Sequence, residues 1–119
     1  MKETSYDLEK RTARFSEGIV ALVKRCKKDA LLFPILSQLL RAGTSVGANY
    51  CEANGASSRR DFMNKIHICK KEAKETEYWL RVLVSAVPEA ADECKTLSKE
   101  AHELTLIFSK IAASTKRSI

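Results

Sequence analysis

Apolar residues recur at alternating steps of three and four positions in four separate segments of the chain. In the first segment this series is Leu8, Phe15, Ile19, Leu22 and Cys26. Such spacing places side chains along one face of an α-helix. The pattern therefore predicts four amphipathic helices, at about residues 5–28, 34–54, 58–86 and 89–114.

Turn-forming residues separate these segments. Pro34 suits the first position of a helix, Gly55 suits the position after a helix end, and Ser58 is an expected N-cap. Pro88 marks the last boundary. Four helices joined by short connections favour an all-α, antiparallel up-down-up-down four-helix bundle. A chain of 119 residues is of the size of one domain, so we predict that residues 1–119 form a single bundle.

The second segment carries very little charge. Between Asp29 and Glu52 the only formally charged residue is Arg41, which predicts a helix covered on more than one side. Gly43 and Gly47 weaken this helix intrinsically. We expect them to allow a neighbouring helix to approach closely.

The third segment has a second apolar face, roughly opposite its core stripe. This face contains the only tryptophan of the chain. A cluster of this kind on a helix that already has a core face indicates a partner surface, and we predict self-association through it. The candidate interface residues are Ile68, Tyr78, Trp79 and Val82, with Ala86 on the same face.

A basic stripe lies between the two apolar faces of the third segment. The net charge of the chain is +6, and a positive surface attracts polyanions such as nucleic acids. Glu75 and Glu77 are helical neighbours of several of these bases, so a solvated, self-paired face is the alternative interpretation. The stripe consists of Arg60, His67, Lys74 and Arg81 at steps of seven, with Lys70 and Lys71 beside it.

Motifs for catalysis are missing from the sequence. His67 and His102 fall on different helices, and neither has a zinc-ligand partner at helical spacing. The acidic group around Glu72 lacks the Glu-x-x-His motifs of a di-iron bundle. There is no glycine-rich phosphate loop and no nucleophile elbow. We therefore predict a protein that is not an enzyme, with no cofactor, no metal and no small-molecule substrate.

The four cysteines are too far apart for a Cys-x-x-Cys metal knuckle. Each falls on or beside an apolar stripe, which predicts buried, reduced thiols. The first residues lack the apolar run of a signal peptide, and no segment has the length of a membrane span. We expect a cytoplasmic protein without a membrane partner.

Two central motifs carry a family resemblance. Residues 37–53, SQLLRAGTSVGANYCEA, resemble the second-helix signature of the bacterial four helix bundle protein family. Residues 58–62, SRRDF, and residues 72–80, EAKETEYWL, resemble its third-helix signature. The motif positions are Asn49, Glu52, Phe62, Glu75 and Glu77. This is the family of 23S rRNA-intervening sequence proteins, and it is similar to the accessory protein of diversity-generating retroelements.

The resemblance, over about residues 5–114, implies a barrel-like homopentamer with a basic surface. In the retroelement members that surface binds a reverse transcriptase and RNA. We therefore expect a homo-oligomeric accessory protein that binds structured RNA, another nucleic acid or a nucleic-acid-processing protein. A protein–protein scaffold without a nucleic-acid role is the alternative. The candidate nucleic-acid-binding residues are Arg59, Arg60, Lys70, Lys71, Lys74 and Arg81.

Overall fold

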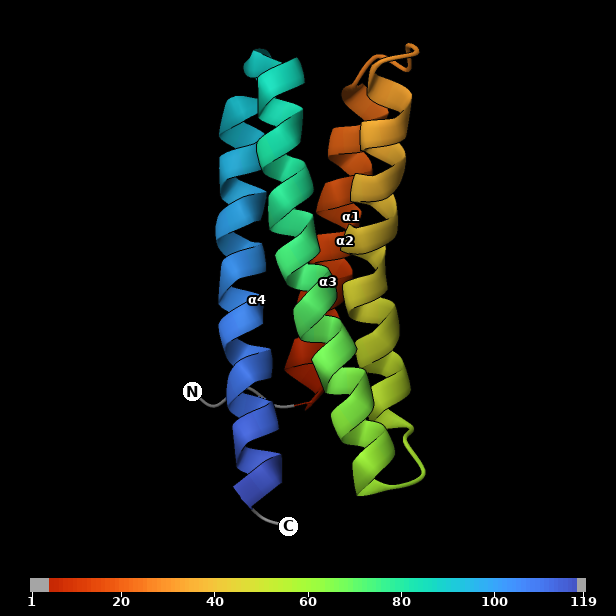
Figure 1. Cartoon of the computed structure of the whole chain (residues 1–119), viewed down its shortest axis with the longest axis vertical. Coiled ribbons are helices and arrows are strands. Elements are labelled where there is room, and N and C mark those ends of the chain that lie inside the picture. The colour runs from red at the N-terminus through yellow and green to blue at the C-terminus, as the bar shows by residue number, and fades with distance from the viewer. Residues whose placement is uncertain (1–4, 118–119) are drawn as a thin grey trace.

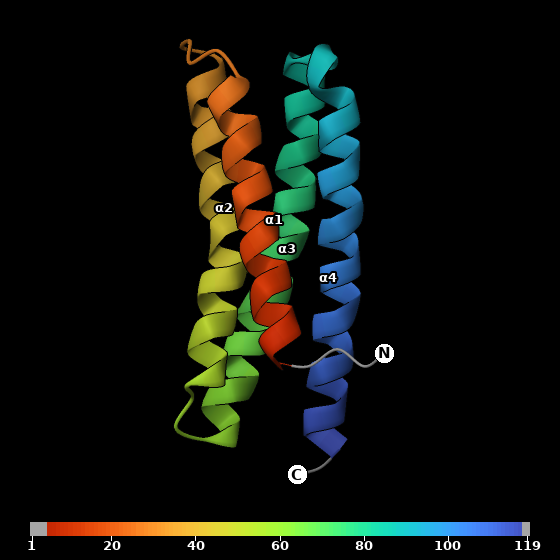
Figure 2. The same ribbon diagram turned by 180° about the vertical axis from the view of Figure 1, so that it is seen from behind.

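Four long α-helices make up most of the chain in the computed structural model, which describes residues 5–117. Each helix runs antiparallel to the one before it (Figures 1 and 2), so the predicted up-down-up-down bundle is confirmed. A short 3-10 turn, η1 (Pro88–Ala90), leads into the last helix. The helices are α1 (Ser5–Arg25), α2 (Leu32–Asn54), α3 (Arg59–Ala86) and α4 (Ala91–Arg117).

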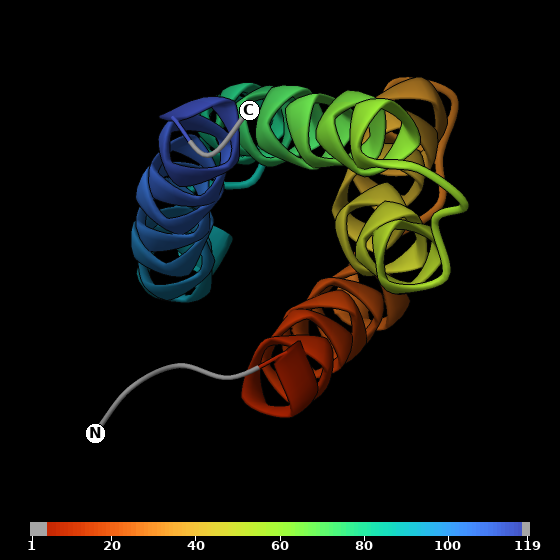
Figure 3. The same ribbon diagram turned by 90° about the horizontal axis from the view of Figure 1, so that it is seen from below.

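The helices follow one another around an arc when the bundle is viewed along its length (Figure 3). The middle helices α2 and α3 each lie between two other helices, whereas α1 and α4 form the ends of the arc and make less contact with each other. Because α2 lies between α1 and α3, the prediction that this charge-poor helix is covered on more than one side is confirmed.

Two helix ends differ from those expected from the sequence. The helix α1 ends at Arg25 instead of residue 28, and the Lys28 ammonium donates hydrogen bonds to the carbonyls of Val23 and Cys26 at this end. The helix α2 begins at Leu32, two residues before Pro34. Its start is fixed by Asp29, whose Oδ1 accepts a 2.8 Å hydrogen bond from the Leu32 N–H.

Of the remaining boundaries, those of the connection between α2 and α3 agree with the sequence, whereas the end of α4 does not. Gly55 follows the end of α2, and the Ser58 hydroxyl accepts a 3.0 Å hydrogen bond from the Asp61 N–H at the start of α3. Both roles were expected. The helix α4 continues to Arg117, beyond the predicted end at residue 114.

The predicted apolar stripes form the core between the helices. A Cβ atom built on Gly43 would lie 2.7 Å from Ile19 Cγ1, so the expected close approach of α1 to α2 occurs there. Among the largest fully buried side chains are Phe108, Ile19, Leu39, Ile66, Leu80, Leu83 and Leu104.

The cysteines are only partly as expected. Cys26, Cys69 and Cys94 are buried, and burial raises the pKa of the Cys69 thiol to about 12. Cys51 is exposed, so its predicted burial was wrong. The buried position on this turn of α2 belongs to its neighbour Tyr50, and the next residue along a helix points about 100° away.

Charged side chains connect α1 to α4, the pair of neighbouring α-helices that make the least contact. Arg11 Nε lies 2.7 Å from Glu100 Oε2, and Arg11 Nη2 lies 2.8 Å from Glu103 Oε1. At the other end of the same seam Arg25 pairs with Glu93. A groove of about 540 Å³ lies along the seam, beside the Arg11 pairs.

Among residues 5–117, no helix has a stretch both long and apolar enough to cross a lipid bilayer. The same part of the chain holds no cluster of three or more His, Cys, Asp or Glu side chains that could bind a metal ion.

Candidate nucleic-acid interface

The basic stripe of α3 lies on the side of that helix that faces solvent. The α2 and α4 helices cover its flanks, and its core residues point into the bundle. Lys70 is half-buried, and the remaining members are exposed. These exposed members are Arg60, His67, Lys71, Lys74 and Arg81.

The carboxylates near the stripe point to other helices. Glu75 binds Arg41 of α2, and Glu77 Oε2 lies 3.9 Å from Nδ1 of His102 on α4. In the described chain, neither Lys74 nor Arg81 forms an ion pair, and the same holds for Arg60, Lys70 and Lys71. The structure thus does not show the self-paired arrangement that was the alternative for this face.

The predicted basic residues do not form one compact patch. Arg59 and Arg60 lie in the first turn of α3, about 15 Å along the helix axis from Lys70 at 1.5 Å per residue. Lys74 follows Lys70 after one turn, and Arg81 follows Lys74 after two turns. The arrangement is therefore an extended line of charge rather than a pocket.

A lysine of α4 extends the basic surface beside Arg81. Lys95 and Arg81 both line a groove of about 270 Å³ between α3 and α4, with Val84 and Ser98. Sequence analysis did not include Lys95, because residues 87–119 carry equal numbers of basic and acidic residues. The sequence places Lys95 next to Cys94 of the α4 core stripe, and this position indicates that Lys95 lies at the border of the core. Only the packing of α4 against α3 shows that Lys95 lies beside Arg81.

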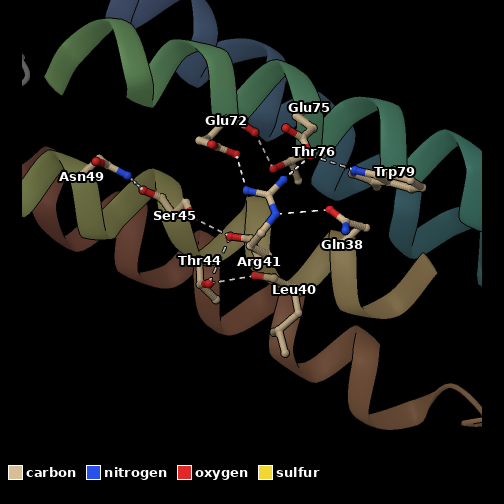
Figure 4. A network of polar contacts seen from close by, with 10 residues as sticks. All are labelled: Gln38, Leu40, Arg41, Thr44, Ser45, Asn49, Glu72, Glu75, Thr76 and Trp79. Atoms are coloured by element: carbon tan, nitrogen blue, oxygen red, sulfur yellow. Dashed lines mark hydrogen bonds and ion pairs between the residues drawn. The ribbon is translucent and has the colours of Figure 1, made fainter. Parts of the chain in front are cut away.

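On the opposite flank of α3, Arg41 is the centre of a polar network (Figure 4). Its Nη1 lies 3.1 Å from Glu72 Oε1, its Nη2 binds Glu75, and its Nε donates to Gln38 Oε1 at 3.2 Å. Burial opposes the charge of Arg41, but the hydrogen bonds to Glu75 and Glu72 outweigh this effect and raise the pKa of the guanidinium. The only basic residue of α2 thus binds α3.

The same network holds the only tryptophan. The Trp79 indole N–H donates a 3.0 Å hydrogen bond to Glu75 Oε2 (Figure 4). This bond lowers the pKa of Glu75, burial opposes the shift, and the hydrogen bond from Arg41 adds to it. The Tyr78 ring meets the Trp79 ring edge-on, with centroids 5.0 Å apart and an interplanar angle of 78°.

The candidate interface residues differ in exposure. Ile68, Trp79 and Val82 are half-buried, and Trp79 packs partly against the core. Tyr78 is 57% exposed. Tyr78 therefore differs from the other three in its environment.

The family-motif residues are spread over several contacts. The Asn49 amide donates to the Ser45 carbonyl at 2.8 Å, and Glu52 accepts a 2.7 Å hydrogen bond from Lys65. Phe62 is half-buried against the core. Of the motif positions, Glu75 binds the Arg41 side chain directly, and Asn49 joins the same network through Ser45, whose hydroxyl donates to the Arg41 carbonyl (Figure 4). Sequence analysis had singled out Arg41 only for its isolation.

Comparisons with known proteins agree with this architecture. Residues 4–111 match the family model of the 23S rRNA-intervening sequence protein. A similar solved structure is the crystal structure of a protein of unknown function from the S23 ribosomal protein family of Bacteroides thetaiotaomicron. The two chains share 36% identity with a TM-score of 0.80, over 87% of this chain and 96% of the other. No curated protein sequence matches the chain.

Proposed function

The chain belongs to the 23S rRNA-intervening sequence protein family, and from this membership and the basic stripe of α3 we propose that it binds RNA. We propose a cytoplasmic, non-enzymatic accessory protein that contacts structured RNA through Arg59, Arg60, Lys70, Lys71, Lys74 and Arg81, with Lys95 beside Arg81. The observation that carries this proposal is that the exposed bases of the stripe from Arg60 to Arg81 form no ion pair in the described chain, and that the attraction between Lys71 and Glu75 acts without direct contact.

Exposed bases that follow one another along a single helix are suited to phosphate groups. Binding of this kind gains free energy from the release of condensed counterions, and it requires no pocket. Lysine and arginine contacts to phosphates position a nucleic acid but do not read its sequence. We therefore propose recognition through charge and shape, as is usual for structured RNA.

Charge reversal tests the proposal directly. In the triple variant Lys70→Glu, Lys71→Glu, Lys74→Glu, we expect loss of RNA binding with far-UV circular dichroism unchanged. Each phosphate contact contributes about 0.7–0.9 to the slope of log K against log salt concentration. Residual binding should therefore have a slope smaller by about 2–3.

A matched control has the same change in net charge at a different place. Arg14 and Lys99 line the groove between α1 and α4, and Lys110 is exposed on α4. The triple variant Arg14→Glu, Lys99→Glu, Lys110→Glu should bind RNA more weakly only through the general charge of the protein. Equal losses in the two triple variants would show that net charge, and not the stripe, attracts RNA.

Self-association is the second part of the proposal. Ile68, Trp79 and Val82 are half-buried apolar residues of α3, and we propose that this apolar strip contacts another subunit in a ring of five. A closed ring would repeat the basic stripe around its surface and increase the local positive potential.

Light scattering on a sizing column tests the assembly. Val82→Asp leaves the Arg41 network intact, and it should lower the measured mass to that of one chain, 13.3 kDa. A Val82→Asp protein with the parent mass would exclude this strip as the interface. A ring that carries no RNA and instead binds one protein in fixed stoichiometry after nuclease treatment would favour the scaffold function.

A further inference from the structure

Tyr78 stands among the bases of the stripe. Seven residues before it is Lys71, four residues before it is Lys74, and three residues after it is Arg81. At these helical spacings all four side chains lie on one face of α3. All four are exposed. At 57% exposure, Tyr78 presents more of its ring than a core or seam residue does.

The orientation of this exposed ring is restrained. The Tyr78 ring packs against the Trp79 indole in a T-shaped pair. The Trp79 indole is itself held in place, because its N–H donates a hydrogen bond to Glu75. Glu75 is in turn bound by Arg41 from α2. The polar network of Figure 4 therefore positions an aromatic surface at the border of the basic stripe.

We propose that Tyr78 is a stacking platform for an unpaired nucleobase of RNA, with the neighbouring phosphates on Lys74 and Arg81. An exposed aromatic ring beside a line of bases is the combination that binds single-stranded segments, because every base has a face that can stack. A paired base within a helix is already stacked on both sides, so the platform selects loops and bulges. This inference rests on the proposed RNA binding and adds the part of the RNA that is recognised.

The charges around Tyr78 favour RNA over a second subunit at this residue. Lysines are depleted in protein interfaces, and a subunit placed on Tyr78 would have to cover Lys71, Lys74 and Arg81 as well. In the described chain none of these three cations forms an ion pair that would reduce the cost of burying it, and the attraction between Lys71 and Glu75 acts without direct contact. Tyr78 thus belongs to the RNA surface, and the subunit contact is left to Ile68, Trp79 and Val82.

Two labelled RNAs of equal length separate this inference from the proposed function. One is a hairpin with an unpaired loop, and the other is a blunt, fully paired duplex. In anisotropy titrations, Tyr78→Ala should weaken binding of the hairpin by about 5- to 100-fold, as expected for the loss of one stacked base. Binding of the duplex should change by less than about twofold, and Tyr78→Phe should bind both RNAs like the parent.

The contrary outcomes are distinct. If the parent protein binds neither RNA, the proposed function fails and this inference fails with it. If the parent binds but Tyr78→Ala weakens hairpin and duplex equally, or neither, only the stacking inference is wrong. A lower mass of Tyr78→Ala in light scattering would assign Tyr78 to a subunit contact and overturn the inference in the same way.

Discussion

Arg41 of α2 binds Glu72 of α3 across the seam between these two helices, with 3.1 Å between Nη1 and Oε1. The Glu72 side chain is only 10% exposed, whereas that of Arg41 is 45% exposed. Water therefore reaches the Arg41 side chain more easily than the Glu72 carboxylate, so the charge of Glu72 depends more strongly on its ion-pair partner. A carboxylate left in a buried position without a counter-charge is strongly destabilising.

Arg41→Met should lower the free energy of unfolding by about 1–3 kcal/mol, because Glu72 loses its cation and Arg41 was not fully buried. Urea unfolding followed by circular dichroism measures this change. The double variant Arg41→Met, Glu72→Gln should recover part of the loss, since a neutral amide leaves no buried charge. An Arg41→Met protein as stable as its parent would mean that water already satisfies Glu72.

Glu75 should make the protein sensitive to acid. The Trp79 and Arg41 hydrogen bonds hold the pKa of Glu75 below its ordinary value, so this carboxylate stabilises the folded state above about pH 4.3, its unfolded pKa. That contribution is lost as the pH falls through the lowered folded pKa. In Glu75→Gln the loss of stability between about pH 6 and pH 3 should be smaller than in the parent.

Trp79 provides the measurement, because it is the only tryptophan of the chain and its fluorescence therefore reports a single site. Its emission in urea titrations at each pH gives the free energy of unfolding for both proteins. The remaining carboxylates are common to the two proteins and cancel in the comparison. Parallel losses in parent and variant would show that Glu75 does not titrate with a lowered pKa.

The glycines of α1 and α2 should respond in opposite ways to alanine. Alanine favours a helix by about 1 kcal/mol over glycine, but at Gly43 its Cβ would meet Ile19 Cγ1 at 2.7 Å. Overpacking of this kind costs about 1–3 kcal/mol, so we expect Gly43→Ala to be destabilising. At Gly18 the nearest atom is the flexible end of Leu97, at 3.0 Å, and Gly18→Ala should be neutral or stabilising.

Thermal unfolding of the two glycine variants checks this contrast, with the parent in the same scan. The sign of the difference is the decisive quantity, because both substitutions give the same gain in helix propensity. A Gly43→Ala protein with an increased Tm would mean that α1 and α2 move apart without loss of stability.

Thiol labelling should separate Cys51 from the other cysteines. Cys51 is exposed, whereas Cys69 is buried and burial raises its pKa to about 12. Since the thiolate is the reactive form, a maleimide at neutral pH should modify one thiol per folded chain, and Cys51→Ser should remove it. Rapid modification of a second thiol in the native protein would show that the core opens readily.

The fold was accessible from sequence because every helix repeats its apolar positions with the same period. The helix ends were less accessible, because Lys28 and Asp29 fix them through hydrogen bonds that hydrophobic spacing does not encode. Cys51 is exposed because it follows the buried Tyr50 by one residue. To predict this exposure, the rotation of α2 about its own axis would have had to be known accurately.

The candidate site was accessible only in part. The spacing of Lys74 and Arg81 gave the line of charge on α3, but helical spacing alone left open whether Glu75 and Glu77 pair with these bases. Those carboxylates turn to Arg41 and His102 on other helices. A pairing between helices depends on which helices are neighbours, and a single sequence does not contain that information.

The seam between α1 and α4 is connected by Arg11 with Glu100 and Glu103, and by Arg25 with Glu93. These pairs are partly exposed, so dissolved salt weakens them far more than it weakens a buried apolar contact. The ionic strength of the solution thus changes how firmly α1 is held against α4. As salt rises, the backbone amides of α1 should be the first to exchange with deuterated solvent, while the α2–α3 pair stays protected.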